Sequence, residues 1–123
     1  MKSMNPSDVA QRAYQLVRKA MPDLDQRIGR FTVLTEPADS DLQLFFREHV
    51  AGVLPELRAA LERTDMTAVY RQAHGLKGAG GSVGYPEISA LSERLEETAK
   101  AGESAEALCL AEVLARWLDE ASA

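Results

Sequence analysis

A histidine and a lysine three residues apart, His74 and Lys77, are the side chains in this chain whose type and spacing most clearly indicate chemistry. A neutral imidazole is a competent nucleophile near neutral pH, because the unperturbed pKa of histidine is about 6.5. On a helix, residues at i and i+3 are neighbours, so the flexible ammonium of Lys77 can follow an anion attached to His74. The pair predicts a site at which His74 carries an anionic group and Lys77 stabilises its charge.

Glycines surround this pair at a density that selection for stability alone would not produce. Four of the seven residues 75–81 are glycine, and each costs a helix about 1 kcal/mol relative to alanine. Gly78 and Gly81 lie at i+4 and i+7 from His74 and share its stripe of helix surface, and Gly75 and Gly80 add to the bare surface. Such a bare stripe would give another macromolecule access to the imidazole. The alternative is that the glycines mark close helix packing and that His74 is an ordinary surface residue.

Helical periodicity accounts for nearly the whole chain, so helices must position these residues. We expect helices from the N-cap Asn5 to Pro22, over residues 23–35, from Asp39 or Ser40 past a bend near Pro55 to about Leu61, from the cap Asp65 to about Gly81, from Tyr85-Pro86 to Gly102, and after the cap Ser104. In the long helix, Leu42, Phe45 and Phe46 begin the face expected to turn to the core. No segment shows strand alternation, and the fold class is therefore predicted to be all-α.

The loops between the four later helices are short, which implies antiparallel neighbours. We therefore predict an antiparallel up-down four-helix bundle over residues 39–123. One or two additional helices in residues 1–38 would pack on this bundle as an accessory part of a single structural domain. A bundle that buries its own apolar stripes has no need of a second copy, so we expect a monomer.

Composition excludes several classes of protein. The 123 residues suffice for one core, the formal net charge is −5 without a basic block, and no apolar run nears the length of a membrane span, so we expect neither nucleic acid nor membrane as a partner. The N-terminus lacks the apolar core of a signal peptide, and one cysteine, Cys109, fits a reducing compartment, which together indicate the cytoplasm. We expect His49 to be a partly buried structural residue. The soft metal ligands of the chain, His49, His74 and Cys109, show no metal-ligand spacing. No phosphate-binding G-x-x-x-x-G-K-[ST] loop occurs. We expect no metal, no cofactor and no means of binding ATP.

The residues around His74 resemble those of histidine phosphotransfer (HPt) domains. The pattern A-H-x-L-K-G-x5-G-x3-L-x6-L-E is matched by Ala73-His74, Leu76-Lys77-Gly78, Gly84, Ile88 in the leucine position, and Leu95-Glu96. Upstream, Phe46, the pair Leu57 and Leu61, and Asp65 stand where such domains have an aromatic residue, two leucines and a capping aspartate, so the likeness covers about residues 40–121. The run at residues 77–85 is also similar to the phosphoacceptor domain of chemotaxis histidine kinases.

This resemblance implies a phosphocarrier in a two-component phosphorelay and not an enzyme in its own right. A receiver domain's aspartyl phosphate would pass its phosphoryl group to His74, and from there it would move to a second receiver. In this family the receiver supplies the Mg²⁺ ion and most catalytic groups, so partners would be response-regulator receivers or a histidine kinase. Surface residues near His74, such as Arg71 and Gln72, would then set which partner is recognised.

In the chemotaxis-kinase subset, the glutamate of the Leu-Glu pair hydrogen-bonds the phosphoacceptor imidazole, which implies this orienting role for Glu96. On a helical wheel Glu96 flanks the apolar stripe of Leu91 and Leu95, so an antiparallel helix could aim its carboxylate at His74. A solvated glutamate on the flank of the helix is the equal alternative. Glu93 departs from the subset, because it stands where those kinases often carry a second histidine.

Three other interpretations stay open to different degrees. The dimeric phosphoacceptor domain of a sensor kinase fits poorly, since its histidine is followed by an acidic residue and a Thr/Asn-Pro pair, whereas Gly75 follows here and the next proline is Pro86. A helical adaptor without phosphochemistry would keep the fold and lose the activity. A domain excised from a larger chemotaxis-type kinase would keep the site, although the complete N-terminal cap and helix favour a self-standing protein.

Overall fold

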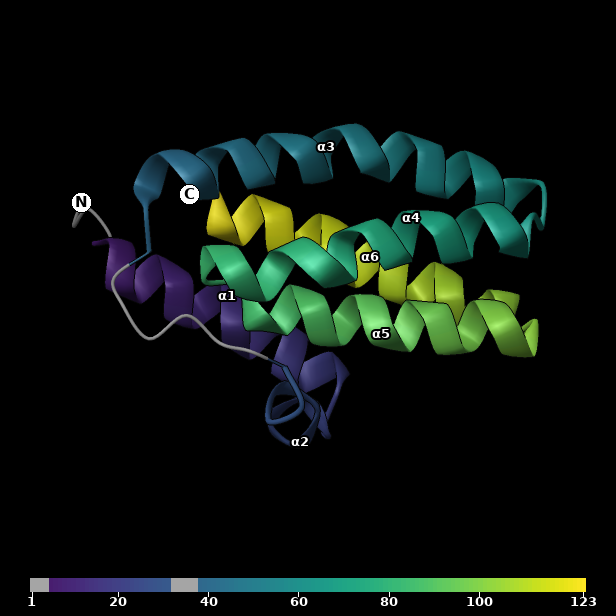
Figure 1. Cartoon of the computed structure of the whole chain (residues 1–123), viewed down its shortest axis with the longest axis horizontal. Coiled ribbons are helices and arrows are strands. Elements are labelled where there is room, and N and C mark those ends of the chain that lie inside the picture. Colours follow the sequence, from purple (N-terminus) through teal and green to yellow (C-terminus); the bar gives the residue numbers. More distant parts are fainter. Residues whose placement is uncertain (1–4, 32–37) are drawn as a thin grey trace.

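The computed structural model describes residues 5–31 and 38–123. All regular secondary structure in these residues is helical (Figure 1), which confirms the predicted all-α class. The elements are α1 (Pro6–Ala20), α2 (Leu24–Ile28), α3 (Ser40–Glu62), α4 (Met66–Gly80), the 3₁₀ turn η1 (Gly81–Val83), α5 (Pro86–Ala101) and α6 (Ser104–Ala121).

Short polar side chains begin three of these helices, as the sequence predicts. The side chain of Asn5 accepts a hydrogen bond from the backbone N–H of Asp8 at 2.9 Å. Asp39 caps α3 in the same way, and Asp65 accepts from the N–H of Ala68 at 3.1 Å. Each cap satisfies backbone N–H donors that have no partner within the helix, which favours the start of a helix at these residues.

Three helix boundaries differ from the expectation. The second helix ends at Ile28, a residue before Gly29, and is followed by a turn; its predicted last residues, 32–35, lie outside the described residues. Ser104 is the first residue of α6 and does not cap it, since Glu103 stands at the cap position without a side-chain hydrogen bond. The helix that carries His74 ends at Gly80 and tightens into η1.

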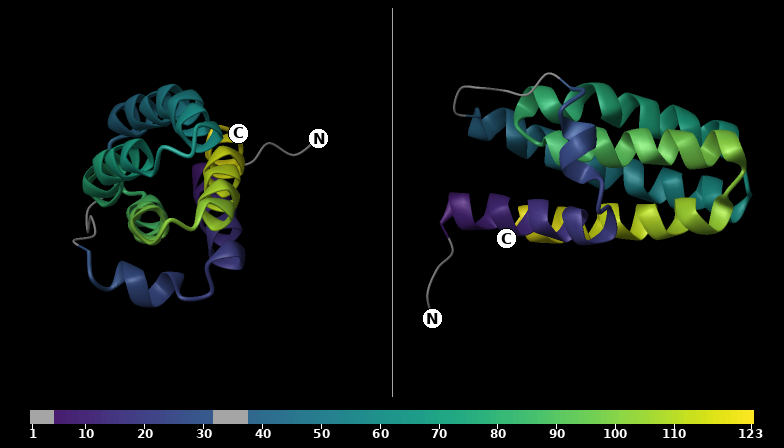
Figure 2. Two further views of the ribbon diagram at one scale, coloured as in Figure 1. Left: turned by 90° about the vertical axis from the view of Figure 1, so that its right-hand side faces the viewer. Right: turned by 90° about the horizontal axis from the view of Figure 1, so that it is seen from below.

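Helices α3 to α6 lie lengthwise against one another. Contacts join α3 to α4, α4 to α5, α5 to α6 and α6 back to α3, and in Figure 1 each of these helices runs back along the one before it. Helix α1 packs along α6, and α2 lies across α5, outside the group formed by α3 to α6 in the end-on view of Figure 2. One hydrophobic core runs through the helices, with Trp117, Leu57 and Leu91 among its fully buried side chains.

The start of α3 corrects the expected core. Phe46 is buried and lies 5.9 Å from the ring of Tyr85, but Leu42 and Phe45 are 55% and 72% exposed. The core direction of α3 is set by Phe46 and Val50, and Phe45 lies about 100° around the helix from Phe46. The apolar stripe read from the sequence is therefore wider than the part of the helix that the bundle covers.

A buried arginine fastens α2 to α5. Arg27 is only 7% exposed, and its guanidinium donates to Asp23, Glu93 and Glu97 at 2.7 Å each. Arg30 adds a second contact to Glu93 at 2.7 Å. Hydrogen bonds from Arg27 lower the pKa of Glu97 to about 2. Glu93, which stands where chemotaxis kinases often have histidine, is thus occupied in holding α2.

A buried carboxyl group, that of Glu87, lies in the first turn of α5. Its side chain accepts a hydrogen bond from the indole N–H of Trp117 at 2.9 Å, and the residue is 3% exposed. Burial raises the pKa of Glu87 to about 7, and the neutral donors, the indole of Trp117 and the residue's own backbone N–H, do not offset it.

Replacing Glu87 with glutamine should change how stability depends on pH. The folded state keeps its proton up to about pH 7, whereas the unfolded chain loses it near its ordinary pKa of about 4.3, so wild-type stability falls as pH rises across this window. Glu87→Gln removes that loss, and its advantage over wild type should grow between pH 4.5 and pH 8 by on the order of 3 kcal/mol. Urea unfolding followed by circular dichroism measures the difference.

Glu62→Gln, which changes an exposed glutamate of α3, is the matched control and should follow the wild-type curve. Parallel pH profiles of the wild type and Glu87→Gln would contradict the raised pKa.

Candidate functional site

His74 lies on the outer side of α4, with 63% of its side chain exposed, and one ring nitrogen is held from within. Nδ1 lies 2.8 Å from Oε2 of Glu96, whose side chain is only 6% exposed. An ionised carboxylate can only accept, so Nδ1 carries the proton and donates. In the neutral ring, Nε2 then keeps its free electron pair.

Lys77 takes the other oxygen of the same carboxylate. Its Nζ lies 2.6 Å from Oε1 of Glu96, so the two oxygens are divided between the two side chains of α4. Burial alone would raise the pKa of Glu96, but the hydrogen bonds from Lys77 and His74 hold it below its usual value. The hydrogen bond to Glu96 in turn raises the pKa of Lys77. Glu96 is therefore not the solvated flank residue of the alternative interpretation.

The close contact of α4 with α5 positions this carboxylate. Ser89 on α5 donates to the carbonyl of Lys77 and accepts from the N–H of Gly81, both at 2.8 Å. A Cβ at Gly80 would lie 2.9 Å from the backbone nitrogen of Ser89 and 2.9 Å from the carbonyl oxygen of Tyr85. Only glycine at position 80 lets the two helices approach this closely.

The glycines of the predicted stripe therefore divide into two groups. Gly80 and Gly81 were expected to extend the open surface, but both are buried, and the N–H of Gly81 donates to Ser89 of α5. For Gly80 and Gly81 the helix-packing interpretation holds. A Cβ at Gly75 or Gly78 would meet nothing within 4 Å, so the surface on either side of His74 is bare.

Two residues that the sequence analysis did not single out, Tyr70 and Lys100, also lie at the site. The ring of Tyr70 stacks on His74, with centroids 5.9 Å apart and an interplanar angle of 14°. Nζ of Lys100 lies 5.2 Å from the centroid of the Tyr70 ring. In the sequence, Tyr70 lies four residues before His74 and Lys100 lies four residues after Glu96. This helical spacing could have identified both residues as neighbours of the site. Arg71 lies on the exposed side of α4.

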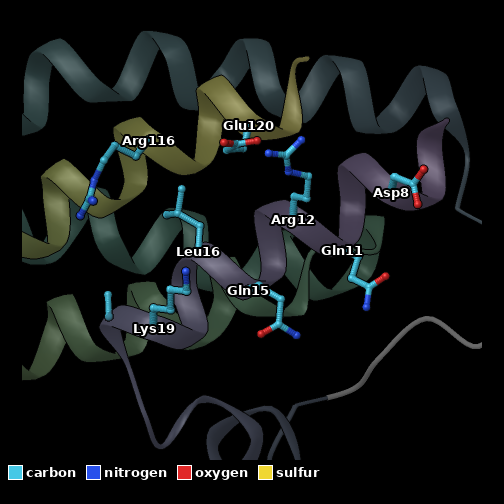
Figure 3. Close-up of a pocket in the computed structure, with 9 residues that line it drawn as sticks. Asp8, Gln11, Arg12, Gln15, Leu16, Lys19, Arg116 and Glu120 are labelled. Atoms are coloured by element: carbon cyan, nitrogen blue, oxygen red, sulfur yellow. The ribbon is translucent and has the colours of Figure 1, made fainter. Parts of the chain in front are cut away.

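The other candidate sites lie elsewhere or carry no chemistry. A groove of about 900 Å³ between α1 and α6 (Figure 3) is lined by Asp8, Gln11, Arg12, Gln15, Leu16, Lys19, Ala20, Arg116 and Glu120, and so by none of the residues around His74. His49 is exposed, not partly buried as expected.

Within residues 5–31 and 38–123, no cluster of three or more His, Cys, Asp or Glu side chains could hold a metal ion. In the same residues, no helix has the length and apolar character needed to cross a membrane.

A family model described as Hpt domain matches residues 41–123. The match covers α3 almost entirely and α4 to α6 completely, with His74, Lys77 and Glu96 inside it, and leaves α1 and α2 outside. The chain therefore belongs to the Hpt domain family, as its sequence pattern predicts. Hpt domains are phosphocarriers of phosphorelays and have no ATP site of their own. No curated protein and no solved structure matches the chain.

Removing the carboxylate of Glu96 should change which nitrogen of His74 carries the proton. A hydrogen bond to a charged acceptor is worth about 1.5–3 kcal/mol, so Glu96→Ala should shift the tautomer ratio toward the Nε2–H form by about tenfold or more. The ¹⁵N chemical shifts of the imidazole at pH 8 report this ratio directly.

Glu97→Ala is the matched control, because Glu97 is the next residue of α5 and is bonded to Arg27 instead of to the ring. An unchanged tautomer ratio in Glu96→Ala would show that the buried carboxylate does not set the proton's position.

Proposed function

We propose that this chain accepts a phosphoryl group on Nε2 of His74 from the aspartyl phosphate of a receiver domain and passes it to the aspartate of another receiver. The observation that carries the proposal is the pairing of Glu96 with Nδ1 of His74 and with Lys77 in an Hpt domain. This pairing leaves Nε2, the proposed nucleophile, on the side of the exposed ring that faces away from the buried carboxylate. On this proposal, α3 to α6 are the antiparallel four-helix bundle that carries the site.

The transfer needs no proton movement at the attacking nitrogen. The electron pair of Nε2 forms the bond to phosphorus as the bond from phosphorus to the aspartyl oxygen breaks, and the aspartate leaves as a carboxylate. The imidazole becomes a cation that keeps its Nδ1 proton, and Glu96 stabilises that charge. Lys77 lies one turn along α4, where its ammonium can also meet the phosphoryl oxygens. The reverse step uses the same groups, so both directions are supported.

Most of the remaining machinery is assigned to the partner. Phosphoryl transfer from an acyl phosphate requires charge neutralisation on the phosphoryl oxygens, for which we expect Mg²⁺ on the receiver and no cofactor on this chain. We propose a monomer acting in the cytoplasm, with receiver domains or a histidine kinase as partners.

The exposed apolar residues of α3 offer a docking surface beside the site. Leu42 and Phe45 share one flank of α3 with Glu56, since the three are spaced by three and eleven residues. Glu56 accepts a hydrogen bond from Gln72 of α4 at 3.0 Å, so this flank faces α4. The apolar side chains therefore border the same helix that carries the bare glycines.

The distance from this flank to the imidazole fits a protein interface. The pairing of Glu56 with Gln72 puts His74 level with about Leu54, and Phe45 is nine residues away, which is about 14 Å along the helix. An interface of about 800 Å² per partner has a radius of about 16 Å. The helix axes of α3 and α4 are a further ~8–10 Å apart, so a receiver docked across both helices and centred between His74 and Phe45 would cover both side chains.

Phosphorylation assays with purified partners test the proposed relay. Mixed with a phosphorylated receiver, or with its kinase, ATP and Mg²⁺, the protein should acquire phosphate that is labile in acid and stable in base. His74→Gln should lose this label completely, because no other side chain in the site is a nucleophile of this kind. His49→Gln removes the other histidine of the chain and should be labelled like the wild type.

Absence of label with every receiver and kinase of its own cell would defeat the proposal and favour an adaptor. Labelling from a kinase alone, with no receiver as donor, would favour a domain of a larger kinase.

A large side chain at Gly78 should block docking without harming the fold. A Cβ there meets nothing within 4 Å in the free protein, and the rest of a leucine side chain would stand on the face where the receiver must approach His74. Gly78→Leu should therefore slow transfer from a phosphorylated receiver by at least about tenfold, equivalent to 1.4 kcal/mol. Quench-flow transfer assays measure the rate, and thermal unfolding checks the fold.

Ala105→Leu, at an exposed position of α6, is the matched control and should transfer normally. Phosphoramidate, a small phosphodonor, should still label Gly78→Leu. Unimpaired transfer from the receiver would show that the bare surface is not the docking face.

A further inference from the structure

We propose that Tyr70 is a positioning residue of the phosphoacceptor site, whose ring fixes the plane of the His74 imidazole and holds the ammonium of Lys100 next to it. The inference deepens the proposed function and rests on His74 being the phosphoacceptor.

One hydrogen bond cannot fix the orientation of the imidazole. The contact from Glu96 restrains the position of Nδ1, but it leaves the ring free to tilt about that contact. With 63% of its side chain exposed, His74 has little else around it. Tyr70, one turn earlier on α4, lies nearly parallel to the imidazole, at 14° with centroids 5.9 Å apart, within the range of offset stacking.

The plane of the ring matters because it sets the direction of the electron pair on Nε2. That pair must point along the line of the phosphorus–oxygen bond that breaks, and misalignment of the attacking atom is costly to transfer rates. A hydrogen bond at one edge and an aromatic ring stacked on one face together define both position and plane. Tyr70 therefore acts on the reaction through His74.

Tyr70 also places a cation beside the site. Lys100 is one turn beyond Glu96 on α5, and its Nζ lies 5.2 Å from the centroid of the Tyr70 ring, within the range of a cation–π contact. Because both rings are this close, Nζ is at most about 11 Å from the centre of the imidazole. The long side chain of Lys100 is exposed, so it can turn toward His74.

The charges of the site explain why a further cation is needed. Before transfer, the ammonium of Lys77 and the carboxylate of Glu96 neutralise each other at 2.6 Å. A phosphoryl group then adds about −1.5 to −2 charges. The imidazolium formed at His74 and the ammonium of Lys77 together offset Glu96 and only part of the phosphoryl charge, so about −0.5 to −1 charge remains. Lys100 has no ion pair within the described part of the chain.

Two substitutions separate a positioning role from simple packing. Tyr70→Phe keeps the flat ring and removes the hydroxyl, whereas Tyr70→Leu keeps an apolar side chain of moderate size and removes the ring face. Tyr70→Phe should transfer phosphate at the wild-type rate, and Tyr70→Leu should be slower by about fivefold, as expected for the loss of one aromatic contact. Urea unfolding of each variant checks that the fold is retained.

The proton spectrum of His74 supplies a readout that does not depend on phosphorylation. Stacking on Tyr70 should shift the imidazole carbon-bound protons upfield; the shift should persist in Tyr70→Phe and disappear in Tyr70→Leu. Unshifted protons in the wild type would overturn the proposed stacking even if transfer occurs. Shifted protons in a protein that never accepts phosphate would instead leave the stacking in place and defeat the proposed function.

Lys100 is tested against Tyr70 by a double-mutant cycle. Lys100→Gln should slow transfer by about threefold in the wild type but have little further effect in Tyr70→Leu, because the ring that holds the ammonium is already gone. Fully additive effects would show that the two act separately. A wild-type rate in Tyr70→Leu, or equal losses in Tyr70→Phe and Tyr70→Leu, would overturn the positioning role.

Discussion

The interaction on which the site depends is the buried carboxylate of Glu96, shared between the Nδ1 proton of His74 and the ammonium of Lys77. A carboxylate removed from water is costly unless hydrogen bonds and opposite charge compensate it, and here both oxygens are satisfied. Its two partners lie on the solvent side, so the imidazole of His74 is anchored from the interior while its other nitrogen stays outside. The close approach of α4 and α5 at Gly80 keeps the carboxylate in register with both partners.

Helix α5 shows how strongly surroundings decide the state of a buried carboxyl group. Glu87 and Glu96 are nine residues apart on the same helix and similarly buried. Glu87 receives only neutral donors, the indole N–H of Trp117 and its own backbone N–H, and burial raises its pKa to about 7. Burial acts on Glu96 in the same direction, but a cation and a ring N–H outweigh it and hold the pKa below the ordinary value. Glu87 therefore tends to keep its proton in the core, whereas Glu96 is an anion that holds His74 and Lys77.

The sequence predicted well those features that depend on residues within one or two helical turns. The caps Asn5, Asp39 and Asp65 and the adjacency of His74 with Lys77 are of this kind, because a helix fixes its own neighbours at three to four residues. Glu96 was reached only through the family resemblance, since its distance to His74 depends on how two helices pack.

Features that depend on packing between distant segments were predicted wrongly or were missed. Gly81 was assigned to the open surface because its position on α4 fits the stripe, but the turn into α5 buries it. Leu42 and Phe45 are apolar at the correct period, yet nothing in the bundle reaches them. The role of Glu93 depends on Arg27, sixty-six residues earlier in the chain. Periodicity reports which face of a helix is apolar and does not report which neighbour covers it.

The position of His74 on an open helix surface has a consequence for how such a site would select its partners. A nucleophile inside a pocket can discriminate by the shape of a small substrate, whereas an exposed ring flanked by Gly75 and Gly78 presents almost no shape of its own. On the proposed function, any receiver's acyl phosphate offers the same reacting atoms, so the chemistry cannot distinguish one receiver from another. Discrimination must then come from the area around the ring, where one interface docked across α3 and α4 could cover both His74 and Phe45. On the same proposal, the bare glycines would allow a partner to approach, and the side chains of α3 would decide which partner stays long enough for transfer.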